Sequence, residues 1–167
     1  MKHKLLYLFA TMLAMAPAWA QNAGGEGGDD VVRLELLPGS ASQMSIEALE
    51  DGSYHITTAG GDPYVSTTEL SRDLYADENY VCMEYYSPTG MGQCEFFFNQ
   101  GRGFVGGREQ QFAMGGCDDW VTYFVDISES REKFKWGAER DFMRFDTGTA
   151  AGLELYVRNI HFINEEK

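Results

Sequence analysis

The residues best suited to chemistry are aromatic and charged side chains that stand close together, most densely in FKWGAERDFMRFD at residues 134–146. Trp136 lies in this stretch, with Arg140 and Asp141 shortly after it. An indole offers a flat apolar surface for the C–H groups of a sugar ring, and guanidinium and carboxylate groups at its rim can hydrogen-bond hydroxyls. Trp136 is therefore either a platform for a ligand or a plug at one end of the fold. Structural use is the commoner fate, because burying an indole contributes about 2 kcal/mol or more.

Other candidates alternate with apolar positions in strand-like stretches or, like Trp120, stand at an element boundary. Alternate residues of a strand share one face, so those opposite the apolar set are expected to point outward together. The candidate ligand-binding residues are Trp120, Trp136, Phe97, Phe124, Tyr156, Arg144, Glu84 and Tyr86. Such a mixture of rings and charges is what a carbohydrate-binding face requires. The alternative is that the rings are cross-strand partners that stabilise a sheet, or are covered by a loop or a neighbouring domain.

Patterns for catalysis or metal binding are weaker. No Ser-His-Asp, Cys-His or His-Glu-x-x-His arrangement stands out, and 26 acidic residues form carboxylate pairs by chance without identifying one. Asp118 with Asp119, or Asp29 with Asp30, could contribute to a calcium site, although solvated surface acids are commoner. The expected protein is not an enzyme and has no cofactor or metal site, with calcium as an open alternative.

The glycine-rich stretch GRGFVGGRE at residues 101–109 superficially resembles a phosphate-binding loop. No Gly-Lys-Ser ending or strand-to-helix context accompanies it. The better interpretation is a loop that presents Arg102, Phe104 and Arg108 beside the sheet.

Residues 1–20 have the pattern of a cleavable secretory signal peptide. Lys2 and Lys4 precede an apolar run, and the small residues of Ala-Trp-Ala stand before Gln21. The apolar run is interrupted by Pro17 and is short for the roughly 20 residues that span a bilayer. The mature protein is therefore expected to be secreted or periplasmic, with no membrane span.

A single domain is expected over residues 31–163, between a flexible linker at residues 21–30 and a C-terminal tail at residues 164–167. Acidic side chains outnumber basic ones by 26 to 13, which gives a net charge of −13. A chain of this charge repels phosphate backbones, so a nucleic-acid partner is not expected.

Short runs of alternating apolar and polar residues, separated by glycine, proline, asparagine and aspartate, predict strands joined by turns. The stretches VVRLEL and WVTYFVDI are two of them, and in the second Val121, Tyr123, Val125 and Ile127 form the clearest inward face. Nine or ten such strands with almost no helix predict an all-β protein, a β-sandwich with jelly-roll topology.

Three local features complete this picture. Asp-Gly at residues 51 and 52 predicts a hairpin turn, and one helical turn capped by Ser128 is expected in SESREKFKW. In the last strand the apolar phase changes by one residue after Val157. An extra residue near Arg158 and Asn159, a β-bulge, explains that change.

Three cysteines, Cys82, Cys94 and Cys117, occur in a chain predicted to enter an oxidising compartment. One disulfide and one leftover thiol are expected, and three pairings are open. The preferred pair is Cys94 with Cys117, because both stand at predicted strand ends whereas Cys82 lies within a strand.

Several stretches together resemble a known group of domains: TTAGGDPYVSTTELSRDL followed by YVCMEYYS, then WVTYFVDISE and WGAERDFMRFDTGTAAGLELYVRNIHF. They are similar to galactose-binding-like jelly-roll modules, of the carbohydrate-binding-module type, in secreted polysaccharide-processing proteins of gut and marine Bacteroidetes. The similarity spans most of residues 31–163, and its most specific element is the Trp-Gly, Arg-Phe-Asp-x-Gly-Thr and Arg-Asn-Ile sequence near the end. The resemblance implies a carbohydrate-binding or ancillary domain that works beside a catalytic unit.

The leading hypothesis is a secreted, non-catalytic module that binds a polysaccharide or oligosaccharide by aromatic stacking, with polar contacts at the rim. The alternative is a structural or protein-interaction module that packs against a catalytic domain or partner protein through the same face. The chain is expected to be either a stand-alone module or a piece of a longer protein.

Overall fold

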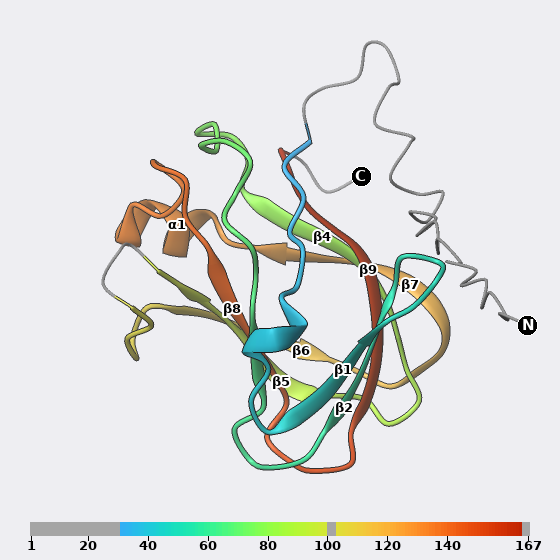
Figure 1. Cartoon of the computed structure of the whole chain (residues 1–167). Coiled ribbons are helices and arrows are strands. Elements are labelled where there is room, and N and C mark those ends of the chain that lie inside the picture. The colour runs from blue at the N-terminus through green and yellow to red at the C-terminus, as the bar shows by residue number, and fades with distance from the viewer. Residues whose placement is uncertain (1–30, 100–102, 165–167) are drawn as a thin grey trace, which may run out of the picture. The chain divides into compact units, whose positions relative to one another are not determined.

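The computed structural model describes residues 31–99 and 103–164, and regular structure in this part of the chain is almost entirely β-strand (Figure 1). The strands are β1 (Met44–Ala48), β2 (Tyr54–Thr58), β3 (Tyr64–Ser66), β4 (Tyr80–Ser87), β5 (Gly92–Phe98), β6 (Glu109–Met114), β7 (Cys117–Asp126), β8 (Met143–Thr147) and β9 (Glu154–Ile163). One helix, α1 (Ser128–Phe134), and a 3-10 turn at Pro38–Ser40 accompany them. The predicted signal peptide and linker, residues 1–30, and most of the predicted tail lie outside the described residues, so these remain predictions.

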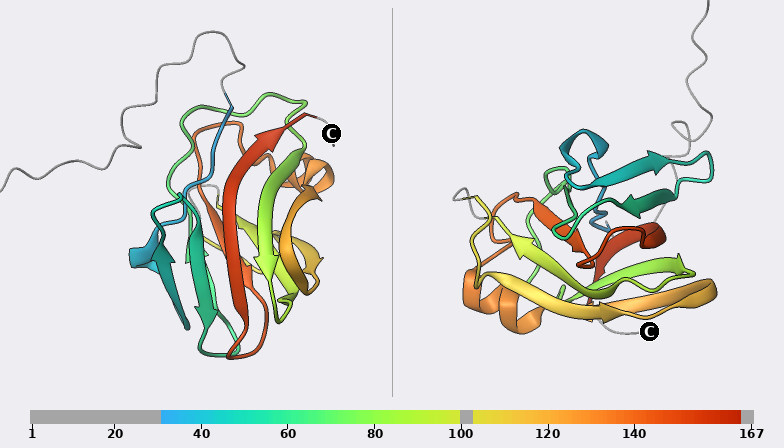
Figure 2. Two further views of the ribbon diagram at one scale, coloured as in Figure 1. Left: turned by 90° about the vertical axis from the view of Figure 1, so that its right-hand side faces the viewer. Right: turned by 90° about the horizontal axis from the view of Figure 1, so that it is seen from below.

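The strands form two antiparallel sheets that stack as the layers of a sandwich (Figure 2). The five-stranded sheet has the order β1-β2-β9-β4-β7, and the four-stranded sheet has the order β3-β8-β5-β6. After β2 the chain changes sheet at every connection except the one from β5 to β6. Neighbours within a sheet are therefore mostly distant in sequence. The predicted all-β sandwich is confirmed.

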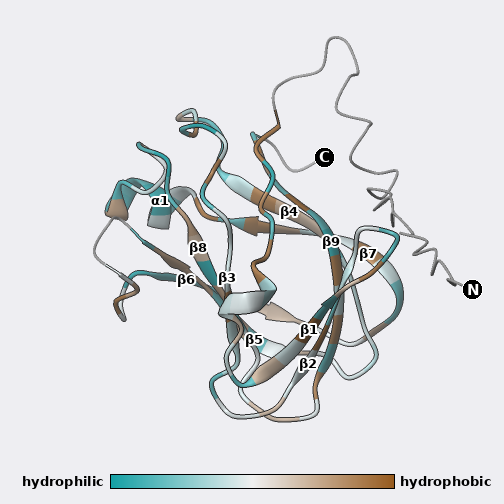
Figure 3. Cartoon of the chain, in the orientation of Figure 1, coloured by the Kyte–Doolittle hydropathy of each residue, from teal (hydrophilic) through white to brown (hydrophobic). Residues whose placement is uncertain are grey.

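The core lies between the sheets, where the inward residues of each strand meet. Hydrophobic and hydrophilic residues follow one another along the strands (Figure 3). The fully buried side chains include Ile56, Val65, Met83, Phe96, Phe98, Met143, Phe145, Leu155 and Phe162. Strict alternation puts one side of each strand into this layer and the other side outward, because successive side chains point to opposite faces. The outward positions of the two sheets are consequently on opposite sides of the molecule.

The segment before β1 is buried without forming the regular strand predicted for it. Val32 and Leu34 pack into the core, and backbone hydrogen bonds join the segment to β9, from Leu34 N–H to the Ile160 oxygen at 2.8 Å and from Phe162 N–H to the Val32 oxygen at 2.9 Å. Only isolated bridges occur here, because the segment contacts β9 over a few residues.

The inward face predicted on β7 has the right direction, but its first half is incompletely buried. Val125 and Ile127 are buried, but Tyr123 is only half-buried and Val121 is 37% exposed. β7 is an edge strand that pairs on one side only, with β4, so fewer neighbours cover it. Alternation predicted the direction of these side chains, but their burial depends on what lies above them.

The predicted turn and bulge are confirmed. Gly52 has φ +82°, and the turn closes with a hydrogen bond from Leu49 N–H to the Ser53 oxygen at 2.8 Å. On β9, Asn159 has φ +53°, and the pairing with β4 shifts between Cys82 and Glu84 by one extra β9 residue. This bulge keeps Val157 and Ile160 on the inner face.

The predicted cap of the helix is wrong. α1 begins at Ser128 itself, and the capping position is Ile127, which makes no side-chain capping bond. The Ser128 hydroxyl instead donates to Asp126 Oδ1 at 2.6 Å.

Candidate functional site

The outer face of the four-stranded sheet carries a grid of polar and aromatic side chains centred on Arg144. The antiparallel register aligns them in two rows across the strands, and we call these eight residues the Arg144 face. The first row is Tyr64, Asp146, Glu95 and Gln111, and the second is Ser66, Arg144, Phe97 and Glu109. Neighbouring strands lie about 4.8 Å apart, so each row presents a side chain at roughly that interval.

Arg144 is held in one orientation from two sides. Its Nε and Nη2 donate to the two carboxylate oxygens of Asp146 at 2.7 and 2.5 Å. Its guanidinium carbon lies 4.4 Å from the ring centroids of both Tyr64 and Phe97, and 5.6 Å from that of Phe104. A bidentate ion pair and cation–π contacts both restrict the guanidinium plane. Of its five N–H groups, Asp146 takes two, and the others make no hydrogen bond to the described residues.

The carboxyl groups of this face are also positioned. Glu95 Oε1 accepts hydrogen bonds from Gln93 Nε2 and Gln111 Nε2, both at 3.1 Å. Burial raises the pKa of Asp146, while its hydrogen bond and ion pair with Arg144 act in the opposite direction. The face therefore offers fixed donors and acceptors beside aromatic rings.

The outer face of the five-stranded sheet carries a second aromatic group, which we call the Trp120 face: His55, Glu84, Tyr86, Trp120, Phe124, Tyr156 and Arg158. Here three of the rings, those of His55, Tyr86 and Tyr156, stack on one another. His55 and Tyr156 are nearly parallel at 4.3 Å between centroids, and Tyr86 stacks on Tyr156 at 5.3 Å. Ring faces that cover each other are not available to a sugar.

Arg158 organises the rest of the Trp120 face. Its guanidinium carbon lies 4.1 Å from the Trp120 ring centroid, and its Nε donates to Glu84 Oε2 at 2.7 Å. Glu84 Oε1 accepts a further hydrogen bond from Asn159 Nδ2 at 3.0 Å. These two hydrogen bonds, that from Asn159 first, hold the pKa of Glu84 below its usual value. This arrangement repeats that of Arg144 on the opposite side of the sandwich.

No protein-family model and no curated protein sequence matches this chain. Solved structures match its fold. The fold resembles that of family 29 carbohydrate-binding modules. An arginine-to-alanine variant of such a module, made to probe ligand recognition by the family, has a TM-score of 0.50 and 12% identity over 80% of this chain and 90% of that chain. A glutamate-to-arginine variant of a family 29 module has a TM-score of 0.50 and 12% identity over 77% of this chain and 79% of that chain.

The predicted site residues do not share one surface of this β-sandwich. Phe97 and Arg144 lie on the Arg144 face, and the group on the Trp120 face is Trp120, Phe124, Tyr156, Glu84 and Tyr86. Their outward direction was correct, but they belong to different sheets. Sequence analysis missed Tyr64 and Gln111, although the alternation in Pro-Tyr-Val-Ser already pointed Tyr64 away from the buried Val65.

Trp136 is the plug and not the platform. Its side chain is 1% exposed and packs on Phe98 at 5.0 Å and on Phe162 at 5.4 Å between ring centroids. The two phenylalanines come from different sheets, so the indole closes the end of the core between them. A ligand cannot stack on a ring whose faces are covered by protein.

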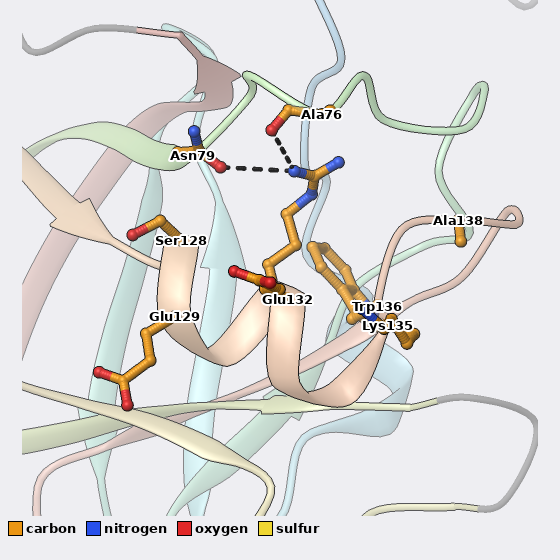
Figure 4. Close-up of a pocket in the computed structure, with 9 residues that line it drawn as sticks. Ala76, Asn79, Ser128, Glu129, Glu132, Lys135, Trp136 and Ala138 are labelled. Carbon is orange, nitrogen blue, oxygen red and sulfur yellow. Dashed lines mark hydrogen bonds between the residues drawn. The ribbon is translucent and has the colours of Figure 1, made fainter.

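A cavity of about 650 Å³ lies beside Trp136 and α1 (Figure 4). Arg131 crosses it and donates from Nη1 to the Ala76 oxygen at 2.8 Å and to Asn79 Oδ1 at 3.4 Å. Arg131 thus ties the connection before β4 to the helix.

The predicted disulfide between Cys94 and Cys117 is absent, and all three cysteines are free thiols. Cys94 lies inside β5 with its side chain in the core, whereas Cys117 begins β7 in the other sheet and accepts a hydrogen bond from Ser87 N–H at 3.4 Å. Burial raises the pKa of Cys94 to about 12. The prediction placed Cys94 at a strand end, and this placement was wrong.

Within residues 31–99 and 103–164, no group of three or more histidine, cysteine, aspartate or glutamate side chains is arranged to hold a metal ion. Asp118 and Asp119 lie exposed on β7, and Asp29 and Asp30 are outside the described residues. No described helix is long and apolar enough to cross a membrane.

Proposed function

We propose that this protein is a non-catalytic carbohydrate-binding module that binds a glycan chain across the Arg144 face. The observation that carries the proposal is the fixed Arg144 guanidinium, held by Asp146 and by two aromatic rings, with three donors left for a ligand. The likeness in fold to family 29 carbohydrate-binding modules supports it.

The chemistry of the Arg144 face suits sugar hydroxyls. Arg144 supplies donors, Asp146 and Glu95 supply acceptors, and Gln111 can supply both. Tyr64, half-exposed at the edge of the sheet, offers ring surface for C–H groups. Because these groups are already fixed by one another, binding costs little side-chain entropy.

The face also favours a neutral glycan over a polyuronate. Arg144 is neutralised by Asp146, and the further carboxylates of Glu95 and Glu109 leave the face with excess negative charge. Like charges across an interface are unfavourable. The outer surface of a sheet can contact several successive sugar units of a glycan. The Arg144 face therefore favours internal units of the glycan over its terminal unit.

The setting that we propose is the secreted or periplasmic space, beside a catalytic domain or partner protein that acts on the same glycan. The signal-like pattern of residues 1–20 supports this setting. In this setting the partner catalyses the reaction, and this module binds the same glycan beside it.

The test compares two matched variants, Arg144→Gln and Arg158→Gln. Each removes an arginine that pairs with a carboxylate and lies over an aromatic ring, one on each side of the sandwich. Affinity gel electrophoresis with soluble neutral glucans, mannans, glucomannan and xylans measures retention. Arg144→Gln should weaken binding about tenfold or more, because hydrogen bonds to charged groups contribute about 1.5–3 kcal/mol. Arg158→Gln should leave it unchanged.

The opposite result, loss with Arg158→Gln alone, would move the site to the Trp120 face. A wild-type protein that no glycan retards would contradict the proposal. Thermal stabilisation by a protein partner and not by sugars would then favour the interaction module instead.

A further inference from the structure

A cavity of about 530 Å³ lies where the Arg144 face ends, immediately before β8. This volume falls in the range of ligand pockets, roughly 300–1,000 Å³. The residues that matter most at its wall are Glu69, Asn99, Glu139, Arg140, Asp141 and Phe142. None of them belongs to the two rows of the Arg144 face.

The cavity adjoins the Arg144 face at the start of β8 and the end of β5. Phe142 precedes Arg144 by two residues and Asn99 follows Phe97 by two, so both extend the outward alternation of β8 and β5. Asn99 N–H donates to the Phe142 oxygen at 3.4 Å, which adds a third row to the register.

Phe104 lies beside both regions. Its ring contacts Phe142 edge-on at 5.6 Å between centroids, and the Arg144 guanidinium carbon lies 5.6 Å from the same ring. The cavity and the Arg144 face therefore adjoin at Phe104.

Asp141 is the residue in this cavity whose carboxyl can accept further hydrogen bonds from a ligand. Its side chain is buried, and Oδ1 accepts one hydrogen bond, from Phe142 N–H at 3.1 Å. No other hydrogen bond and no ion pair reaches this carboxyl from the described residues, although Lys135 and Arg140 also line the cavity. A buried carboxyl with unfilled acceptor capacity is unfavourable unless a donor reaches it. Its pKa is raised to about 6 by burial, with smaller contributions from Glu139 and Glu69.

We propose that this cavity is an additional subsite of the glycan-binding face, in which the Asp141 carboxyl accepts hydrogen bonds from the hydroxyl groups of a further sugar unit. The inference rests on the proposed function of the Arg144 face. The charges of Lys135 and Arg140 balance those of Glu69 and Glu139 around Asp141. The subsite therefore takes a neutral hydroxylated ring and not a second carboxylate.

The subsite should make the affinity depend on the length of the bound oligosaccharide. Asp141 precedes Arg144 by three positions, so their Cα atoms are at most about 11 Å apart. A trisaccharide centred on Arg144 ends short of Asp141, whereas a hexasaccharide that covers Arg144 also reaches Asp141. The affinity should thus increase with length.

The experiment is isothermal titration calorimetry at about pH 8, where Asp141 is ionised, with the tri- and hexasaccharides of β-1,4-linked mannose and glucose. Asp141→Asn keeps the shape of the side chain and an oxygen for Phe142 N–H. Wild type should bind the hexasaccharide about tenfold more tightly than the trisaccharide, and Asp141→Asn should lose most of that advantage. Ala138→Trp, which fills the cavity from an exposed position, should have the same effect.

The two hypotheses fail in different ways. If neither oligosaccharide binds to wild type, the proposed function is wrong. If both bind equally well, or if Asp141→Asn and Ala138→Trp keep the full length advantage, the Arg144 face stands and the subsite is overturned. Arg144→Gln should weaken the binding of both the trisaccharide and the hexasaccharide, and it serves as the control for the Arg144 face.

Discussion

Asp141→Asn should stabilise the protein in a pH-dependent way, because the native carboxyl is buried without a cation partner among the described residues. The pKa of Asp141 rises from 3.8 to about 6 on folding, chiefly through burial. Above pH 6 the folded protein must carry a charge that its surroundings disfavour. Asparagine has nearly the same shape and no charge to bury.

The direction follows from proton linkage. Because the folded pKa exceeds the unfolded one, the folded state binds more protons between about pH 4 and pH 6, and wild-type stability falls as the pH rises through this window. A rise from 3.8 to about 6 corresponds to an upper limit of about 3 kcal/mol, at about 1.4 kcal/mol per pKa unit. Solvent reaches the carboxyl through the cavity and screens it, so about 1–2 kcal/mol is expected.

Urea unfolding at about pH 7.5 and about pH 4 measures this effect. Asp141→Asn should be more stable than wild type by about 1–2 kcal/mol at the higher pH and nearly equal to it at the lower. Asp118→Asn removes the same formal charge from an exposed position on β7 and controls for general charge repulsion. A difference between Asp141→Asn and wild type that is the same at both pH values, or that Asp118→Asn reproduces, would refute the reasoning.

Two further predictions concern the core and the thiols. Trp136→Ala should lower the free energy of unfolding by about 3–5 kcal/mol, as measured by urea titration. Trp120→Ala, at a half-exposed position, should lower it clearly less. Equal losses in the two variants would contradict the role of Trp136 as a plug. Native alkylation with iodoacetamide, followed by peptide mass analysis, should modify half-buried Cys117 first and Cys94 last, because burial raises the pKa of Cys94 to about 12. An intact mass lower by two hydrogens, with Cys94 and Cys117 both protected, would instead reveal the disulfide that the structure lacks.

Much of the architecture could be read from local patterns. Alternation predicted that the structure consists of short strands, the Asp-Gly pair predicted the hairpin turn at Gly52, and the phase change after Val157 predicted the bulge at Asn159. These features depend on neighbours in sequence, because a strand has a period of two and a turn needs only a residue that accepts positive φ. The all-β sandwich follows from such signals taken together.

The candidate site depended on contacts that no local pattern contains. Phe97 and Tyr156 both point outward, but the sequence does not say that they lie on opposite sheets, because strands that pair are far apart in the chain. Trp136 is buried only because Phe98 and Phe162 meet around it. Local composition and spacing determined which side chains leave the core, whereas the long-range pairing of strands decided which of them meet, since that pairing depends on the free energy of the whole core.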